Sequence, residues 1–379
     1  MPPITDPTPM TRALPAPRRT AAEALRLAAD HARLAPSVHN TQPWTLVLRG
    51  RRLEFHADRD RQLRTLDPVG RALTQSIGAA VLNARVSLAS SGWATVVERL
   101  PSAADPDLLV VLTPIEGAPD AGLAPLAGAV PVRRTNRRAF SAAELPEDLL
   151  RRLIGVVAAE GVQLIPVRTE NHRRLVARLT QQADALQNAD AAYRAEMRRW
   201  TTRSPDSRDG VPSAAVPHVD GRQHDDVPLR DFDSTGAGEL PPETHSSSGQ
   251  TMVLLATALD DAAAWLSAGE ALERLLLELT RHGWAAGPLT QAIEVPLTRT
   301  QLRAALTWNA HPQMLLRIGR ATPTPAPPRR LHDDVVEDDM PPPVAATHSP
   351  APWSWSPAPG DGTTSHRPVS DGRGGTSWV

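Results

Sequence analysis

Four arginines lie within six residues in the segment from Arg133 to Arg138, together with one hydroxyl and one amide side chain. Guanidinium groups bind phosphate oxygens through paired hydrogen bonds, and nearby backbone N–H groups can add further donors. The segment therefore fits a phosphate clamp, with a solvated basic turn as the alternative interpretation. Two more arginines follow Pro328. The candidate clamp residues are Arg133, Arg134, Thr135, Asn136, Arg137, Arg329 and Arg330.

A second polar segment follows a predicted helix over residues 21–34 and precedes a predicted strand. Pro36 ends the helix, and the residues after it are small or carry amides, above all Ser37, Asn40 and Gln42. Asn and Gln side chains offer both a hydrogen-bond donor and an acceptor, which is what binding the imide edge of an isoalloxazine ring requires. A capping and turn sequence would also explain these residues.

The third candidate segment is the turn Gly283–Leu289, near the end of a predicted helix. Gly287 allows the backbone to approach a ligand closely, and Pro288 fixes the turn. Leu289 completes the candidate contact surface. A helix cap followed by an ordinary turn is the alternative interpretation.

Two absences narrow the chemistry, since the sequence contains no Cys and no Lys. Disulfides, thiolate nucleophiles, Cys-ligated metals, Schiff-base lysines and Walker phosphate loops are thereby excluded. The formal net charge of -1 gives no electrostatic footprint for nucleic acid or an anionic membrane. No run approaches the roughly 18 apolar residues of a membrane span. The histidines show neither metal-ligand spacing nor a triad partner, so the sequence assigns no metal site and no catalytic acid or base.

An internal repeat indicates which elements hold these segments. Ser76-Ile-Gly-Ala-Ala leads to Ser91-Gly-Trp, and Ser267-Ala-Gly-Glu-Ala leads to His282-Gly-Trp, with the two glycines of each copy 14 residues apart. Apolar residues recur at helical spacing in both copies, and each predicted helix ends at its second glycine. The pattern favours a duplication that contributes one long apolar helix per copy.

The remaining elements are short. A hairpin is predicted around Arg49–Gly50, and further strands over residues 108–112, 162–166 and 314–318. The sequence Ser-Ala-Ala-Glu from Ser141 has the form of a capping box and predicts that a helix begins there. Together these elements indicate an α+β fold.

The predicted organisation has two unlike halves between two unfolded ends. Residues 1–20 and 337–379 are Pro-rich and are predicted to be disordered. Residues 21–130 form the first half. Residues 131–336 form the second, with a lid or insertion at about 195–249. Because the N-terminus lacks the apolar stretch of a signal peptide, we expect a cytoplasmic protein.

The segment A-P-S-x-x-N-x-Q-P-W from Ala35 resembles the flavin-contacting loop of the nitroreductase family. The segment R-R-T-N-R resembles that family's R-R-S-x-R phosphate motif, with Thr135 in the Ser position. The turn at Gly287 and the terminal Pro-Arg-Arg match its glycine-rich turn and its closing basic pair. Here the loop precedes the arginine motif by about a hundred residues, whereas ordinary nitroreductases have the reverse order. This order resembles the actinobacterial Acg group, in which one chain holds two nitroreductase-like halves.

The resemblance covers roughly residues 21–336 and implies a nitroreductase-like fold. In it two half-repeats, each with a small mixed sheet flanked by helices, form an intramolecular pseudo-dimer. FMN lies at the subunit interface in the family. The second half here carries the arginine clamp and the turn, and the first half carries the loop. The reciprocal site lacks these parts, which implies one FMN per chain and a chain that acts as a monomer.

The resemblance also implies an activity. NAD(P)H would pass hydride to the flavin N5, and the small-molecule acceptor would be a nitroaromatic or quinone-like compound. If the insertion covers the flavin, the alternative is a protein that sequesters or stores FMN without turnover. A third interpretation is an interaction protein that recruits partners through its insertion and the tail residues Trp353, Trp355 and Trp378.

Overall fold

The computed structural model divides the chain into two compact units, residues 1–341 and 342–379. The described residues are 18–137, 140–141, 143–201, 206–212, 230, 250–341, 368–370 and 376–378. In the second unit the structure describes an antiparallel pair of strands, β10 (Pro368–Ser370) and β11 (Thr376–Trp378). Trp353 and Trp355 lie outside the described residues, as do residues 1–17 and most of the predicted insertion.

The first unit contains two sheets, and their strands follow the same order when β5 to β8 are matched to β1 to β4. The first sheet runs β3-β4-β2-β1-β9 and the second runs β7-β8-β6-β5. Strands β1 to β4 and β5 to β8 pair antiparallel throughout, and β9 joins β1 in parallel. The strands are β1 (Trp44–Arg49), β2 (Arg52–Ala57), β3 (Ala94–Arg99), β4 (Leu108–Ile115), β5 (Gln163–Pro166), β6 (Thr251–Thr257), β7 (Ala285–Pro288), β8 (His311–Gly319) and β9 (Val336–Asp338).

Helices complete two matching repeats. In the first repeat α1 precedes β1, and α2 follows β2; in the second, α3 precedes β5, and α6 follows β6. The α-helices are α1 (Ala21–Ala32), α2 (Arg71–Ser90), α3 (Glu147–Ala158), α4 (Glu170–Ala189), α5 (Ala191–Thr201), α6 (Ala262–Arg281), α7 (Gln291–Glu294) and α8 (Pro296–Leu306). Short 3₁₀ turns occupy Val38–Asn40, Arg59–Arg61 and Ala124–Ala129.

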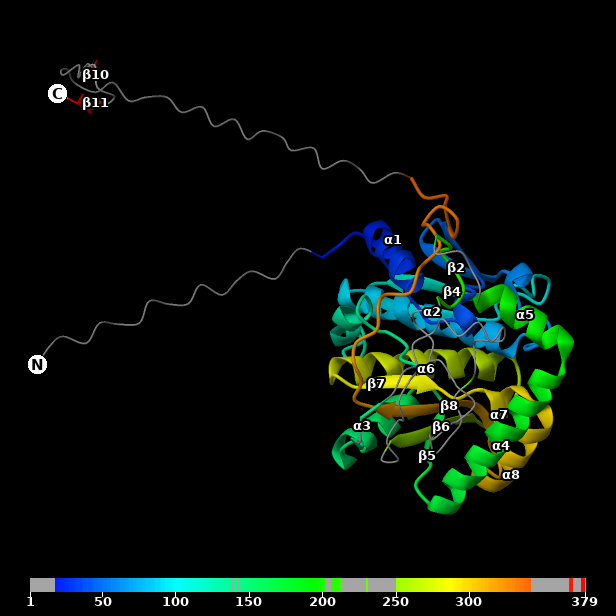
Figure 1. The fold of residues 1–379 in the computed structure, drawn as a ribbon. Coiled ribbons are helices and arrows are strands. Elements are labelled where there is room, and N and C mark those ends of the chain that lie inside the picture. Colours follow the sequence, from blue (N-terminus) through cyan, green and yellow to red (C-terminus); the bar gives the residue numbers. More distant parts are fainter. Residues whose placement is uncertain are drawn as a thin grey trace, which may run out of the picture. The chain divides into compact units, whose positions relative to one another are not determined.

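The two long helices of the repeat, α2 and α6, run side by side between the sheets (Figure 1). Both their first and their last residues are 191 positions apart. They cross at equivalent glycines: a Cβ added to Gly78 would lie 2.2 Å from the Leu266 carbonyl oxygen, and one added to Gly269 would lie 2.0 Å from that of Gln75. Only glycine permits this approach. The predicted repeat is therefore confirmed, and its glycines mark the helix crossing.

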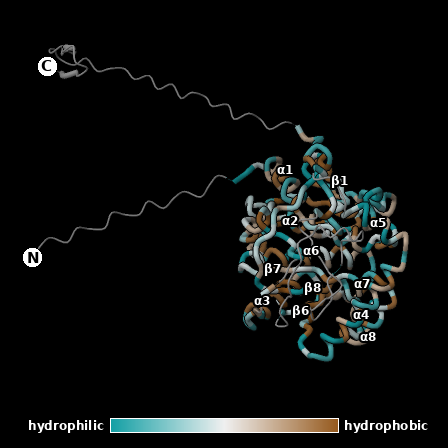
Figure 2. The backbone as a smooth tube through the Cα atoms, viewed as in Figure 1, coloured by the Kyte–Doolittle hydropathy of each residue, from teal (hydrophilic) through white to brown (hydrophobic). Residues whose placement is uncertain are grey.

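Two main apolar cores lie on the outer sides of this helix pair, and apolar segments concentrate along α2, α6, β6 and β8 (Figure 2). One core packs α1 and α2 on the first sheet, around Trp44 and Phe55. The other packs α3 and α6 on the second sheet, around Leu153 and Leu275. Helix α2 is buried on nearly every face because its own sheet covers one side and α6 the other. In the described part of the chain no helix is long and apolar enough to cross a bilayer.

The repeats differ most between their first two strands. In the first repeat the turn at Gly50, which has a φ of 62°, joins β1 directly to β2 as predicted. In the second, residues 167–250 separate β5 from β6 and include α4 and α5. Along α5, Tyr193, Met197 and Trp200 pack against Leu63 and Leu66 of the first repeat. The start of the insertion therefore folds back across the other repeat.

Two boundaries differ from the sequence-based expectations. The predicted capping box at Ser141 was wrong: α3 begins at Glu147 after Pro146, without a side-chain cap. The Ser141 hydroxyl instead bonds to the Arg320 carbonyl at 3.2 Å, because tertiary contact with the end of β8 outweighs the local motif. At the C-terminal end, β9 carries the compact unit on to Pro341.

Candidate functional site

A cleft lies where the two repeats meet. Its volume is about 1170 Å³, including the open mouth. Its walls come from segments far apart in the sequence: the loop after α1, the N-terminal half of α2, the arginine segment, α6, β7, α7 and β8. Of the predicted site residues, the lining includes Pro36, Ser37, Thr135, Asn136, Arg137 and Pro288. The structure thus brings all three candidate segments to one cavity.

The loop after α1 has an unusual backbone. His39, Asn40 and Gln42 adopt φ values of 43°, 57° and 49°, a left-handed region that costs energy for residues other than glycine and that Asn tolerates best. The Ser37 hydroxyl stabilises the turn by accepting the Gln42 N–H at 2.9 Å. Ser76 of α2 accepts the Val38 N–H at 3.0 Å. The loop is therefore held against α2 with Pro36 and Ser37 on the cleft wall.

The two predicted amides of this loop do not line the cleft. Asn40 donates to the carbonyls of Gly210 and Pro328, at 3.0 and 3.1 Å, and its Oδ1 accepts from Arg329 at 2.9 Å. The Gln42 Oε1 accepts the Arg330 N–H at 2.9 Å. These amides hold the terminal Pro-Arg-Arg segment beside the loop.

The arginine segment divides between the cleft and the interior. Thr135, Asn136 and Arg137 line the cleft, and burial lowers the pKa of Arg137 to about 10, with Arg230 and Arg133 adding to the effect. Arg133 is buried and lies 3.1 Å from Glu273. Arg134 bonds to the carbonyl of its neighbour Pro131 at 2.9 Å, away from the cleft lining.

A surplus of positive charge surrounds Glu273. Burial raises the pKa of this carboxyl to about 7, against the opposing effect of Arg133. Burial lowers the pKa of Arg329 to about 9, with Arg133 as the next cause. In the described part of the chain, the buried Arg133 Nη1 and Arg329 Nε have no hydrogen-bond partner. Such donors favour an anionic ligand.

The glycine-rich turn forms part of β7. A Cβ on Gly287 would lie 2.4 Å from the Asn136 carbonyl oxygen, so this glycine lets β7 approach the arginine segment. The Asn136 N–H donates to the Ala286 carbonyl at 3.0 Å and joins the two segments. Pro288 lines the cleft, whereas Leu289 is buried in a separate apolar cluster.

The cleft also contains polar residues that the sequence did not single out: His39, Arg71, Gln75, Arg230, Glu294, Gln313 and Arg317. Arg230 belongs to the insertion and pairs with Glu294 of α7 at 2.5 Å. Although burial opposes ionisation, Arg230 and His39 hold the pKa of Glu294 at about 2. Burial and the nearby Arg230 lower the pKa of His39 to about 3, which keeps this ring neutral. The sequence signal that could have found them is a polar residue within a predicted apolar helix, such as Arg71 or the run Thr74-Gln75-Ser76.

Within the described residues, no cluster of three or more His, Cys, Asp or Glu side chains could hold a metal ion. The polar groups of the cleft are mostly guanidiniums and amides, which bind anions and the edges of heterocycles. The arrangement therefore suits an anionic organic ligand with a planar polar edge.

Comparison with known proteins gives the family. The chain matches no family model. It is 35% identical over 321 residues to a Mycobacterium tuberculosis protein named "Putative NAD(P)H nitroreductase Rv3131", covering 83% of this chain and 92% of the relative. It is 31% identical over 311 residues to "Putative NAD(P)H nitroreductase acg" of the same organism, covering 79% and 91%.

The comparison with solved structures gives proteins whose titles name nitroreductases. A nitroreductase with bound FMN from Desulfitobacterium hafniense has a TM-score of 0.34 and 13% identity, covering 55% of this chain and 95% of that one. A nitroreductase-like family protein from Bacillus cereus has a TM-score of 0.31 and 15% identity, covering 54% and 90%. From its identity to the two Mycobacterium tuberculosis relatives along about four fifths of its length, the chain belongs to the nitroreductase family, in the Acg-like group.

Proposed function

We propose that this chain binds one FMN in the cleft and acts as an NAD(P)H-dependent oxidoreductase of the nitroreductase type, working as a monomer. One observation carries the proposal: the loop, the arginine segment and the glycine-rich turn meet at a single cavity between the repeats. The names of the relatives agree with it. When bound, FMN would supply hydride transfer at N5, from NAD(P)H to a nitroaromatic or quinone-like acceptor.

The anionic end of the ligand suits the arginine clamp. Arg133 and Arg329 carry buried donors without partners in the described residues, and a phosphate would supply the missing acceptors. Asn40 and Gln42 hold Arg329 and Arg330 in place. We assign the phosphate to Thr135, Asn136 and Arg137, which line the cleft, with Arg133, Arg329 and Arg330 as further cations of the clamp; Arg134 bonds away from the cleft lining and is left out.

The planar end suits the opposite walls of the cleft. Pro36 and Ser37 come from one repeat, and Pro288 from the other, with Leu272 and Leu276 of α6 as apolar lining. The neutral, buried His39 cannot act as a general acid at physiological pH. The protein's contribution is therefore to bind and orient the ligand and to exclude water.

One observation favours a second candidate, a protein that holds FMN without turnover. Arg230 belongs to the insertion, yet it lines the cleft and bonds to Tyr193, Thr290 and Glu294. An insertion fixed there would limit the access of NAD(P)H. The two candidates share the FMN site and differ in that access.

The first experiment is a visible spectrum of the purified protein after incubation with FMN, followed by anaerobic addition of NADPH or NADH. Bound flavin that bleaches with either nicotinamide supports the reductase. Bound flavin that bleaches only with dithionite supports the holding protein. Absence of bound flavin would contradict both.

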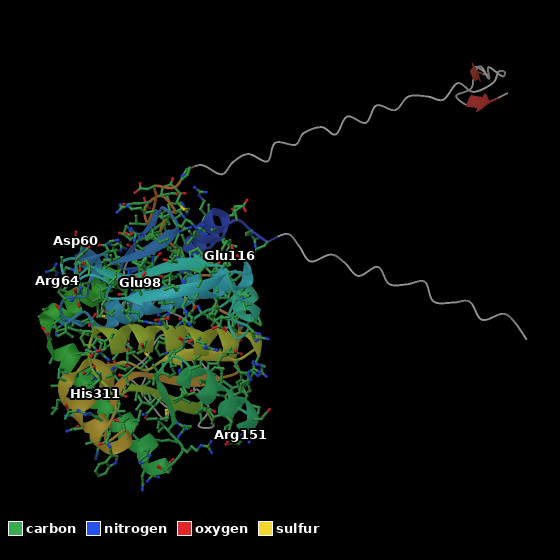
Figure 3. The ribbon with its side chains drawn as sticks, turned by 180° about the vertical axis from the view of Figure 1, so that it is seen from behind. Asp60, Arg64, Glu98, Glu116, Arg151 and His311 are labelled. Atoms are coloured by element: carbon green, nitrogen blue, oxygen red, sulfur yellow. The ribbon has the colours of Figure 1, made fainter. Side chains whose placement is uncertain are left out.

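A variant pair tests the assignment of the clamp. We expect Arg137→Gln to weaken FMN binding by roughly 10–100-fold, because a charged hydrogen bond contributes about 1.5–3 kcal/mol. Arg151→Gln is the matched control, since Arg151 lies on α3 at the periphery, away from the cleft (Figure 3). Fluorescence titration of FMN measures both. Equal weakening in the two variants would show that the loss is not specific to the clamp.

A further inference from the structure

Two polar side chains of α2 stand on the cleft wall outside the three predicted segments. Arg71 and Gln75 are four residues apart and so share a helix face. Arg71 donates to the carbonyls of Gln313 and Ile293, at 3.2 and 3.3 Å. The Gln75 Nε2 donates to the Gln313 Oε1 at 3.0 Å. Both side chains of the first repeat therefore depend on one residue of β8 in the second.

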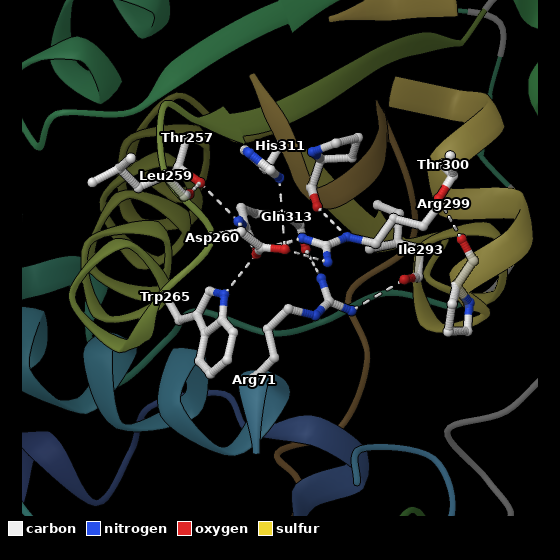
Figure 4. A network of polar contacts seen from close by, with 12 residues as sticks. Arg71, Thr257, Leu259, Asp260, Trp265, Ile293, Arg299, Thr300, His311 and Gln313 are labelled. Carbon is white, nitrogen blue, oxygen red and sulfur yellow. Dashed lines mark hydrogen bonds and ion pairs between the residues drawn. The ribbon is translucent and has the colours of Figure 1, made fainter. Parts of the chain in front are cut away.

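The orientation of the Gln313 amide is fixed by its other neighbours (Figure 4). Its Nε2 donates to Thr257 Oγ1 at 2.7 Å and to Asp260 Oδ1 at 3.2 Å. The Thr257 hydroxyl already donates to the Leu259 carbonyl at 2.7 Å, so it can only accept from Gln313. If the amide turned over, its oxygen would face two acceptors.

Asp260 can also only accept. Arg299 holds its carboxylate with two hydrogen bonds of 2.8 Å, and the Trp265 Nε1 adds a third at 2.8 Å. Although burial opposes ionisation, these bonds hold the pKa of Asp260 well below its usual range. An ionised Asp260 requires the N–H side of Gln313 to face it, which leaves the Gln313 oxygen to accept from Gln75 at 3.0 Å and from Arg299 at 3.4 Å.

The fixed orientation of Gln313 affects the cleft through Gln75, which bonds to Gln313 and lines the cleft. Because its Nε2 donates to Gln313, its Oε1 is left as an acceptor on a side chain that lines the cleft. Arg71, one turn earlier on the same helix, lines the cleft as well, and its guanidinium has more N–H groups than its two carbonyl bonds use. The wall therefore offers an acceptor next to a guanidinium, which complements a ligand edge carrying an N–H group next to a carbonyl.

We propose that Asp260 is a positioning residue: acting through Gln313, it fixes Gln75 and Arg71 to bind the N–H and carbonyl edge of the ligand in the cleft. The inference rests on the proposed function, in which this edge is the imide of FMN. Asp260 itself does not line the cleft. Its role is to favour, together with Thr257 and Arg299, the orientation of Gln313 that turns the Gln75 oxygen toward the ligand.

The test compares the binding of FMN with that of 3-methyl-FMN, which lacks the imide N–H. We expect the wild-type protein to bind FMN roughly 10–100-fold more tightly, because the analogue leaves the Gln75 acceptor unpaired. In Asp260→Asn the new amide can donate to Gln313 and so permits the reversed orientation, although Thr257 and Arg299 still favour the original one. The preference should then fall by at least about threefold. Asp60→Asn, on the surface (Figure 3), is the control and should keep the wild-type preference.

A second variant separates positioning from a loss of fold. Gln75→Met removes the acceptor and keeps the length of the side chain, so it should abolish the preference by itself. Adding Asp260→Asn to it should change the preference no further, because Asp260 acts through Gln75. A further change in that background would overturn the proposal.

The wild-type result distinguishes the two proposals. If the wild-type protein binds both flavins equally, the positioning role is refuted and the proposed function stands. If it binds neither, the proposed function fails and this inference fails with it.

Discussion

The two sides of the α2–α6 crossing place different residues at equivalent positions. On one side, Ala79 and Leu276 line the cleft. Counting 191 residues along the repeat, the corresponding positions on the other side hold Glu270 and Arg85. Small and apolar residues thus leave space for a ligand on one side, whereas charged residues fill the other.

The filled side is a buried network of ion pairs. Glu270 accepts from Arg85 at 2.5 Å and from Arg99 at 2.8 Å. Glu160 accepts from Arg85 at 2.7 Å and from Arg274 at 2.6 Å. Glu160 comes directly after α3, just as the Pro36 loop comes directly after α1. Glu160 therefore occupies the position in the second repeat that corresponds to the cleft loop of the first.

The comparison teaches that a shared backbone does not give two equal sites. The helix crossing is the same for both repeats, and a few side chains decide which side is open. In the described part of the second repeat, Glu160 lies in the short turn after α3, where the first repeat has its cleft loop after α1. This difference supports the proposal of one FMN per chain, and the following predictions test it.

Breaking the filled side should have the largest effect. Arg85→Ala leaves Glu160 and Glu270 with one arginine each, and we expect it to lower the free energy of unfolding by about 3–5 kcal/mol. Urea denaturation measures the change. Arg168→Ala, at an exposed pair with Glu147, should cost less than about 1 kcal/mol.

A double replacement sharpens this prediction. Glu270→Ala with Arg85→Leu installs the residue types that the cleft carries at the equivalent positions. The double variant has no carboxylate at position 270, so none is left there without Arg85. It should therefore be more stable than Arg85→Ala alone. A double variant less stable than Arg85→Ala would contradict the interpretation of the network as a replaceable filling.

The helix crossing common to both sides gives the second prediction. Gly269→Ala would place a Cβ 2.0 Å from the Gln75 carbonyl oxygen, and we expect it to lower the free energy of unfolding by about 3 kcal/mol. Gly155→Ala in α3 is the matched control, because nothing lies within 4 Å of its Cβ position. There the better helix propensity of Ala should raise stability by about 0.5–1 kcal/mol. Similar effects at both sites would exclude a special role for the crossing.

The sequence was sufficient for the parts of the fold that depend on local pattern. The repeated glycines marked α2 and α6, and the Gly50 turn marked the first hairpin. Strand β9 escaped prediction because it has three residues and its partner β1 lies almost 300 residues away. The Ser141 motif misled because a contact with Arg320, far along the chain, satisfies its hydroxyl.

The candidate site shows the same limit. Sequence motifs located the three segments, but they could not say which side chains face the cavity. Asn40 and Gln42 face the terminal arginines instead. Arg71, Gln75 and Gln313 are buried polar residues, and only the packing of α2 against β8 brings them together.

The third and smallest effect concerns Glu273, which lies three residues after Glu270 on α6 and pairs with Arg133 of the arginine segment. Its pKa is raised to about 7 by burial, against Arg133, so the folded protein binds a proton more tightly than the unfolded chain does. The stability from this group is complete below about pH 4.5 and is lost as pH rises through 7. Glu273→Gln keeps an acceptor for Arg133 but cannot ionise. Between pH 5 and pH 8 the wild-type protein should therefore lose about 1–2 kcal/mol of unfolding free energy more than this variant loses. Urea denaturation at the two pH values measures the difference, and equal losses would show that Glu273 does not titrate in this range.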